Sequence, residues 1–354
     1  MIKNNSALHQ KFGMIGSGSW ATALTKILTD NGNPINWWIR NERSIEFIQK
    51  RRHNPTYLQS VYFNTNQLQM SSDINQVIEE SDLLIIGIPS AYIESCLGHL
   101  SPAQLRGKKI ISAVKGILPE QNILLNYYLQ QKFGFPLDAY FAVLGPCHAE
   151  EVAAEKLSYL TFSGVDVAAA AEIASGFSTG YINTIVNHDI LGVQYAAVLK
   201  NIYALGAGMA HGLDYGDNFL SVYIANAADE MASFLREFGA EHIVVGEHEG
   251  EDPITHRRTP NYAASVYLGD LLVTCYSLHS RNRTFGNMIG KGYSVKAAQL
   301  ELNMVAEGYN AAKCIYNINR SVDAPMPIAE SVYKIHWENV KPADGFKQIE
   351  EVLV

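Results

Sequence analysis

Short apolar runs alternate with helical patterns in the first half of the chain. Residues 11–15 form an apolar run, a glycine turn follows at 16–21, and the amphipathic stretch 22–30 comes next. This order predicts a strand, a tight turn and a helix. Gly and Pro residues at 31–34 then end the helix, because glycine accepts a left-handed cap and proline cannot continue a helix. With a second apolar run at 35–39, the segment predicts the first unit of a parallel sheet.

The same alternation continues to about residue 187. Apolar runs bounded by turn or helix signals predict further strands at 83–88, 109–114 and 139–144, with weaker candidates at 158–163 and 181–186. Helices that cover both faces of a parallel sheet produce this alternation. We therefore predict an N-terminal α/β domain with a doubly wound sheet.

The second half of the chain has a helical pattern of apolar residues. From Ile190 onward the apolar residues recur mostly at helical spacing, with little strand signal. This predicts an all-α C-terminal domain and a division into residues 1–189 and 190–354. The segment 240–262, rich in Glu, His and Gly, reads as an exposed excursion. The helices are expected at roughly 190–210, 217–238, 265–278, 294–318 and 326–337.

Length and composition agree with two globular domains. The chain has 354 residues, of which 47% are hydrophobic and 18% charged, and it is too long for one ordinary core. The net charge of −8 argues against nucleic acid or anionic membrane as a partner, because the overall field repels both. Local cations must therefore hold any anionic ligand.

Targeting signals and cysteine spacing point to the cytoplasm. The first ten residues contain no apolar leader, and we find no apolar run near the roughly 20 residues that span a bilayer. The four cysteines form no CxxC pair, which is typical of free thiols in a reducing compartment. The His- and Glu-containing tract at 242–256 lacks the HExxH spacing, so we expect no metal site.

The glycine turn predicts a dinucleotide site. Gly16 permits the tight turn, Gly18 lets backbone N–H groups approach a pyrophosphate, and Ala21 allows close helix packing. The positive end of the helix dipole then faces the phosphates. An ordinary glycine turn is the alternative. About 20 residues on, where an acidic residue would bind the ribose, stands Arg40, so NAD and NADP are both open; a solvated arginine is the alternative there.

Two further segments follow predicted strands at the edge where doubly wound folds bind ligands. Lys115 directly follows the strand 109–114, and an ordinary loop lysine is the alternative. Gly145 directly follows the strand 139–144, and Cys147 to Ala149 then begin a helix. His148, taken alone, is more often a capping or packing histidine than a catalyst.

Lys200 is the most informative single residue, because it interrupts an otherwise apolar helical stretch. A charge there is costly unless it is used or paired, and burial would lower its pKa as a proton donor to a carbonyl requires. A lysine that reaches solvent from a helix edge is the alternative. Asp270 and Thr274 are four residues apart and share a helix face, or form a capping pair that faces water. Arg281 and its neighbours offer guanidinium groups for a phosphate, or a solvated basic turn.

Together these segments resemble the bacterial-type NAD(P)-dependent glycerol-3-phosphate dehydrogenase family along nearly the whole chain. The order and combination of the matching stretches are specific, although none would suffice alone. They are Gly16–Leu24, Val114–Gly116, Leu144–Pro146, Gly192–Gln194, Lys200–Gly208, Leu268–Leu271, Ser280–Arg283, Ala306–Tyr309 and Met326–Ile328.

The resemblance implies a Rossmann-type N-terminal domain and a helical C-terminal domain like that of 6-phosphogluconate dehydrogenase. It also implies reversible hydride transfer between NAD(P)H and C2 of dihydroxyacetone phosphate, giving sn-glycerol 3-phosphate for glycerophospholipid synthesis. Lys200 matches the proton donor, and Asp270 and Asn201 help to set the site. The residues that match substrate contacts are Lys115, Gly145, Cys147, Thr274, Ser280, Arg281 and Asn282. Those that match cofactor contacts are Gly16, Gly18, Ser19, Trp20, Ala21, Arg40, Lys115, Ala149, Arg281, Val305 and Glu307.

Several residues depart from the family pattern, and other functions stay open. Leu220 and Asn226 stand where many members carry Arg, and Cys147 stands where Thr is frequent. Rival interpretations are a related two-domain dehydrogenase of the hydroxyacid or 6-phosphogluconate type, and a non-catalytic NAD(P) sensor. Long apolar helix faces in the second domain also suit a homodimer.

Overall fold

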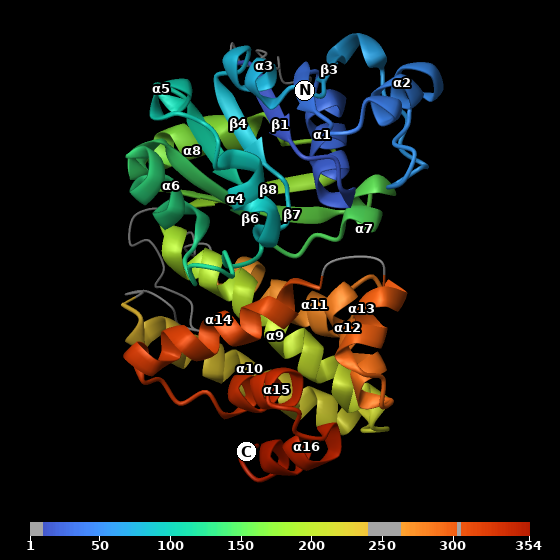
Figure 1. Cartoon of the computed structure of the whole chain (residues 1–354), viewed down its shortest axis with the longest axis vertical. Helices are drawn as coiled ribbons and strands as arrows, with labels where there is room; N and C mark the ends of the chain where they lie inside the picture. Colours follow the sequence, from blue (N-terminus) through green and yellow to red (C-terminus); the bar gives the residue numbers. More distant parts are fainter. Residues whose placement is uncertain (1–9, 240–262, 303–305) are drawn as a thin grey trace, which may run out of the picture. The chain divides into compact units, whose positions relative to one another are not determined.

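The computed structural model describes residues 10–239, 263–302 and 306–354. The chain divides into two compact units. Figure 1 shows the whole chain with colours that follow the sequence. The first unit comprises Met1–Val114 and Leu125–Ile190, and the second comprises Lys115–Leu124 and Leu191–Val354. The division at residue 190 falls beside the boundary expected from the sequence.

The segment 115–124 belongs to the second unit, so its expected place in the N-terminal domain is wrong. Hydrogen bonds to two helices of the second unit, α9 (Ile190–Gly212) and α14 (Glu307–Val322), account for this. Asn201 on α9 donates through Nδ2 to the carbonyl oxygen of Lys115 at 2.8 Å. Asn317 on α14 donates to Oδ1 of Asn122 at 3.4 Å. The chain thus leaves the first unit after residue 114 and returns to it at residue 125.

The first unit is built on an eight-stranded sheet in the order β3-β2-β1-β4-β5-β6-β7-β8. All neighbouring strands are parallel except β6 and β7, which are antiparallel. This confirms the predicted doubly wound sheet. The strands are β1 (Phe12–Ile15), β2 (Ile35–Trp38), β3 (Leu68–Ser71), β4 (Leu83–Ile86), β5 (Lys109–Ser112), β6 (Tyr140–Leu144), β7 (Ser158–Gly164) and β8 (Ile182–Asn187).

Helices cover this sheet, and residues of α1, α2, α7 and α8 share one buried apolar cluster with the strands. Leu24 of α1, Ile48 of α2 and Val152 of α7 pack there with Trp37 and Phe162. The helices of the unit are α1 (Ser19–Asp30), α2 (Glu42–Arg51), α3 (Ile74–Glu79), α4 (Ile93–Leu97), α5 (Pro102–Leu105), α6 (Leu125–Phe133), α7 (Ala149–Ala153) and α8 (Val167–Ser175). Short 3₁₀ turns lie at η1 (Thr65–Gln67), η2 (Ser90–Tyr92) and η3 (Leu137–Ala139).

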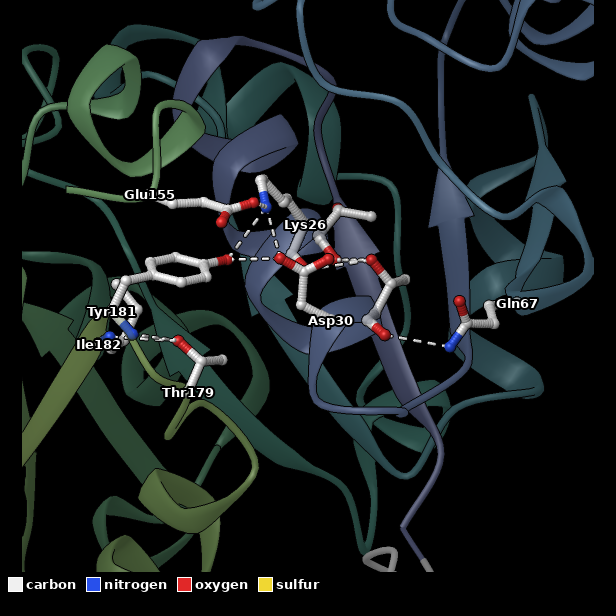
Figure 2. A network of polar contacts seen from close by, with 9 residues as sticks. Lys26, Asp30, Gln67, Glu155, Thr179, Tyr181 and Ile182 are labelled. Carbon is white, nitrogen blue, oxygen red and sulfur yellow. Dashed lines mark hydrogen bonds and ion pairs between the residues drawn. The ribbon is translucent and has the colours of Figure 1, made fainter. Parts of the chain in front are cut away.

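A polar network fixes α1, the helix that follows the glycine turn (Figure 2). The ammonium of Lys26 is buried, forms an ion pair with Asp30, and donates to Oε1 of Glu155 at 3.0 Å. The hydroxyl of Tyr181 donates to Asp30 at 2.7 Å. Because a buried lysine is costly unless it is paired, this network favours one placement of α1 against the segments before β7 and β8.

The second unit is helical, as predicted, but three of its boundaries differ from the sequence expectation. The expected helix 294–318 is two helices, and Ala306, which has extended backbone angles, directly precedes the second. The segment 281–283, for which a solvated turn was the alternative, begins a helix that Ser280 caps, and the helix at 342–350 was not predicted. The remaining elements are α10 (Asp217–Glu237), η4 (Ala263–Gly269, π-helical), α11 (Asp270–Tyr276), α12 (Arg281–Gly290), α13 (Val295–Leu302), α15 (Pro327–Trp337) and α16 (Pro342–Glu350).

Helices α9 and α12 meet through their backbones. A Cβ added to Gly286 would lie 2.0 Å from the carbonyl oxygen of Leu205, and one added to Gly208 would lie 2.0 Å from that of Arg283. Only residues without a side chain allow so close an approach. The contact therefore fixes the start of α12 relative to α9.

In the described part of the chain, α9 alone is long and apolar enough to cross a membrane. It meets this test by its length and mean composition, although Gln194, Lys200 and Asn201 interrupt its apolar residues. The most apolar window of α9 is 94% buried within the chain. Packing against neighbouring elements thus accounts for its apolar character.

Candidate active site

A buried ion pair lies within the second unit. Lys200 on α9 pairs through Nζ with Oδ1 of Asp270, the first residue of α11. The side chains are 3% and 1% exposed, respectively. Lys200 is therefore not a lysine that reaches solvent from a helix edge, and that alternative is wrong.

The surroundings of Lys200 lower its pKa to about 8, and burial is the main cause. The positive charge of Lys115 acts in the same direction, whereas the carboxylate of Asp270 opposes both. An ammonium group with such a pKa can give and regain a proton near neutral pH, which general acid–base catalysis requires.

The second carboxylate oxygen of Asp270 stands out because it is buried and has no hydrogen-bond partner within the described residues. Thr274, one turn later on α11, is buried as well and donates from Oγ1 to the carbonyl oxygen of Asp270. The two residues are thus no capping pair that faces water. An unpaired oxygen beside an ammonium suits a ligand that carries a hydroxyl group.

Two asparagines join four segments around this ion pair. Asn201, next to Lys200, donates to the carbonyl oxygen of Lys115 and accepts at Oδ1 from Nδ2 of Asn282 at 2.8 Å. Oδ1 of Asn282 accepts from the N–H of Gly308 at 3.0 Å. The network therefore ties the 115–124 loop, α9, α12 and the start of α14 together.

The start of α12 carries the residues expected at a phosphate. Ser280 is buried and its Oγ accepts from the N–H of Arg283 at 3.2 Å, so its side chain caps the helix. Arg281 is the first helical residue and is half-buried. Positive side chains at a helix N-terminus reinforce its attraction for anions. The nearby thiol of Cys275 is no candidate nucleophile, because burial raises its pKa to about 12.

In the first unit, the glycine turn has the geometry that a pyrophosphate needs. Gly16 has a φ of +124°, and a Cβ there would lie 2.7 Å from the carbonyl oxygen of Gly87. A Cβ on Gly18 would meet no atom within 4 Å, so its position is open to a ligand. Ala21 is fully buried, and Ser19 and Trp20 form the first turn of α1. The residues present thus fit a dinucleotide.

Arg40 lies between β2 and α2, directly before the N-cap residue Asn41, and is exposed. Among the other expected cofactor residues, Ala149 begins α7 and Glu307 begins α14. Val305 lies outside the described residues, as does the 240–262 excursion. In the described ranges no group of three or more His, Cys, Asp and Glu side chains could hold a metal ion.

The turn after β6 holds the remaining expected residues. Gly145 has a φ of +137°, and a Cβ there would lie 2.5 Å from the carbonyl oxygen of Tyr159. The thiol of Cys147 donates to the same oxygen at 3.0 Å. Both residues thus have a contact with β7 that the sequence did not indicate. All four cysteines are free thiols, as their spacing predicted.

Comparison with known proteins identifies the family. Models of the N-terminus and the C-terminus of NAD-dependent glycerol-3-phosphate dehydrogenase match residues 11–170 and 189–347. The glycerol-3-phosphate dehydrogenase [NAD(P)+] of Bacillus subtilis is 32% identical over 333 residues, 94% of this chain and 91% of that protein. The chain belongs to the NAD-dependent glycerol-3-phosphate dehydrogenase family. It is an NAD(P)-dependent oxidoreductase, and the resemblance seen in its motifs is confirmed.

Other members of the glycerol-3-phosphate dehydrogenase family agree in sequence and fold. The enzyme of Salinibacter ruber is 31% identical over 337 residues, 95% of this chain and 94% of that protein. The crystal structure of the Coxiella burnetii enzyme has a TM-score of 0.84 at 23% identity and covers 97% of this chain and 99% of that one. At that identity the structural likeness concerns the fold.

Leu220 and Asn226, which depart from the family pattern, both lie on α10 and have identifiable contacts or burial. Leu220 is buried on α10. Asn226, also on α10, donates through Nδ2 to the carbonyl oxygen of Val354 at 3.0 Å and accepts from its N–H at 3.3 Å.

Two residues that contact the glycine turn were not predicted from the sequence. They are Trp37 and Asn54, whose side chains donate hydrogen bonds to it. The Asn-Pro pair at 54 and 55 marks a loop in the sequence but does not reveal this contact.

Proposed function

We propose that the chain catalyses the reversible reduction of dihydroxyacetone phosphate to sn-glycerol 3-phosphate with NADH or NADPH. The observation that carries this proposal is the buried pair of Lys200 and Asp270, with the lysine pKa near 8. In this proposal the first unit binds the dinucleotide, and the second unit supplies the proton.

Lys200 donates a proton to the carbonyl oxygen of the substrate as that oxygen becomes an alkoxide, and it takes the proton back in the reverse direction. When bound, NAD(P)H supplies the hydride that C2 receives. Oδ1 of Asp270 holds the ammonium group in place. Oδ2, which has no hydrogen-bond partner among the residues that the structure describes, accepts a hydrogen bond from a substrate hydroxyl. Asn201 keeps the Lys115 loop beside this pair.

Arg281 binds the phosphate of the substrate. Its place at the start of α12 supports this role, because a guanidinium and the positive end of a helix dipole both attract a dianion. By the family resemblance, the other proposed substrate contacts are Lys115, Asn282, Thr274, Ser280, Gly145 and Cys147.

The dinucleotide is bound by the turn at Gly16–Ala21, with Ser19 and Trp20 at the start of α1. Arg40 lies after β2, at the place where the ribose of the adenosine half is bound in such folds. Its guanidinium suits a 2′-phosphate, so we propose NADP as well as NAD as the cofactor. Further proposed contacts come from Ala149, Lys115, Arg281, Val305 and Glu307.

A direct assay tests the proposal. Purified protein is given dihydroxyacetone phosphate with NADH or NADPH in parallel, and oxidation is followed by the loss of nicotinamide absorbance. We expect rapid oxidation with at least one cofactor. Cofactor binding without oxidation would contradict the proposed substrate and favour another hydroxyacid substrate or a sensor role.

The wider role is also proposed. Sn-glycerol 3-phosphate would supply the backbone of glycerophospholipids, and the four free thiols suit the reducing cytoplasm. Exposed Leu272, Tyr276 and Leu278 support a homodimer formed through the second unit. Light scattering would measure the oligomeric state, and a monomer at working concentration would contradict the homodimer.

A further inference from the structure

Asn54 lies outside the glycine motif, in the loop after α2, yet its side chain holds the glycine turn. Its amide nitrogen donates to the carbonyl oxygen of Ser17 at 3.1 Å and to Oγ1 of Thr22 at 3.0 Å. Its Oδ1 accepts from the N–H groups of Thr56 and Tyr57, each at 3.0 Å. Both amide hydrogens and both acceptor positions are therefore used, and the side chain is 3% exposed.

Two other side chains hold the carbonyl groups on either side of Ser17. The indole nitrogen of Trp37 donates to the carbonyl oxygen of Gly16 at 2.7 Å. The hydroxyl of Thr22, which accepts from Asn54, donates in turn to the carbonyl oxygen of Gly18 at 2.9 Å. Three successive carbonyl groups of the turn are thus bound by side chains.

Because the peptide unit is planar, the contacts that hold these carbonyl groups also orient N–H groups. In a trans peptide the C=O of one residue and the N–H of the next point in opposite directions. Holding the carbonyl oxygens of residues 16, 17 and 18 therefore orients the N–H groups of Ser17, Gly18 and Ser19. These groups precede or begin α1 and have no carbonyl of the helix to bind, so they are the donors that a pyrophosphate meets.

We propose that Asn54 is a positioning residue for the dinucleotide pyrophosphate, acting through the Ser17 carbonyl and through Thr22. This inference rests on the proposed function, because it assumes that the glycine turn binds the cofactor. It adds a residue that the glycine motif does not contain. Without Asn54, the Ser17–Gly18 peptide can rotate, and part of the binding energy is spent in ordering it.

The test compares two variants with a matched control. Asn54→Ala removes both donors, whereas Thr22→Val keeps the shape of the side chain and removes only the hydroxyl that links Asn54 to Gly18. Asn33→Ala is the control, because Asn33 is also 3% exposed and donates to a backbone carbonyl, that of Gly176 at 3.1 Å, beyond the other end of α1. Titration of cofactor fluorescence gives the dissociation constant of NADPH, and thermal melting gives stability.

We expect Asn54→Ala to raise the NADPH dissociation constant roughly tenfold, with kcat and the KM for dihydroxyacetone phosphate near their wild-type values. Asn33→Ala should lower the melting temperature but change the dissociation constant by less than about twofold. The double variant Asn54→Ala/Thr22→Val should show less than additive loss, because both residues act on the same turn.

Equal dissociation constants for Asn54→Ala and Asn33→Ala would overturn the proposal, as would full additivity in the double variant. If Asn54→Ala does not fold, the Thr22→Val variant tests the proposal by itself. An NADPH dissociation constant equal to that of the wild type in Thr22→Val would then overturn the proposal. A wild-type protein that binds neither NADH nor NADPH would instead contradict the proposed function, so the two failures are distinguishable.

Discussion

The ammonium of Lys200 and the carboxylate of Asp270 form an ion pair with 3% and 1% of their side chains exposed. A pair so deep in a protein recovers its desolvation cost only partly, and loss of one partner leaves a buried charge. The pair is therefore weak evidence for stability. It is better explained by chemistry, because the remaining oxygen of Asp270 has no partner among the described residues.

Replacement of Lys200 should abolish most of the activity and leave cofactor binding intact. We expect Lys200→Met to lower kcat by roughly 10²–10⁴-fold, the usual contribution of general acid–base catalysis. Because Asp270 is then unpaired, the variant should also unfold at lower urea. Steady-state kinetics on the folded variant checks this, with Lys334→Met as control, since Lys334 is a partly exposed lysine paired with Glu330 on α15. Near-normal kcat in Lys200→Met would refute the proton-donor role.

The pH dependence should have opposite signs in the two directions. Ketone reduction needs protonated Lys200, so its kcat should stay level below pH 8 and fall above it, given a pKa of about 8. Alcohol oxidation needs the neutral amine and should rise over the same range. Asp270 raises the pKa of Lys200, so Asp270→Asn should move both inflections to lower pH. Paired pH profiles of both reactions measure this, and inflections unmoved by Asp270→Asn would contradict it.

Arg281→Ala should weaken recognition of the phosphate in particular. We expect a larger rise in KM for dihydroxyacetone phosphate than for unphosphorylated dihydroxyacetone, because only the first has the partner that was lost. Arg236→Ala, an exposed arginine near the end of α10, serves as the control. An equal effect of Arg281→Ala on both substrates would mean that the arginine does not bind the phosphate.

The sequence revealed those parts of the molecule whose pattern is local. The buried strands, the glycine turn and a lysine within an apolar helix can all be recognised from residues that are neighbours in the sequence. Strand β3 (Leu68–Ser71) escaped notice because it is a half-exposed edge strand without an apolar run. The place of the 115–124 loop depends on Asn201 and Asn317, which lie far along the chain. Likewise, nothing near Asn54 indicates that its side chain reaches Ser17.

Acid should destabilise the second unit through His336. The side chain is buried, its Nδ1 lies 2.8 Å from the carbonyl oxygen of Val332, and burial lowers its pKa from 6.5 to about 4. Below pH 6.5, His336 binds a proton in the unfolded chain but stays neutral in the native chain. The free energy of unfolding therefore falls as the pH is lowered to about 4. His336→Gln should remove up to about 3 kcal/mol of this dependence. Urea unfolding of both proteins across that range measures the difference, and parallel curves would contradict it.

The backbone contact between α9 and α12 gives the last prediction, which concerns Gly286. A methyl group there would lie 2.0 Å from the carbonyl oxygen of Leu205, so Gly286→Ala must force the two helices apart. Overpacking of this kind costs about 1–3 kcal/mol or more. Because α12 begins with Arg281, its displacement should raise the KM for dihydroxyacetone phosphate, while the dissociation constant of NADPH changes less. Gly180→Ala is the control, since a Cβ at Gly180 meets no atom within 4 Å. If Gly286→Ala keeps the stability and KM of Gly180→Ala, then this contact does not fix the position of α12.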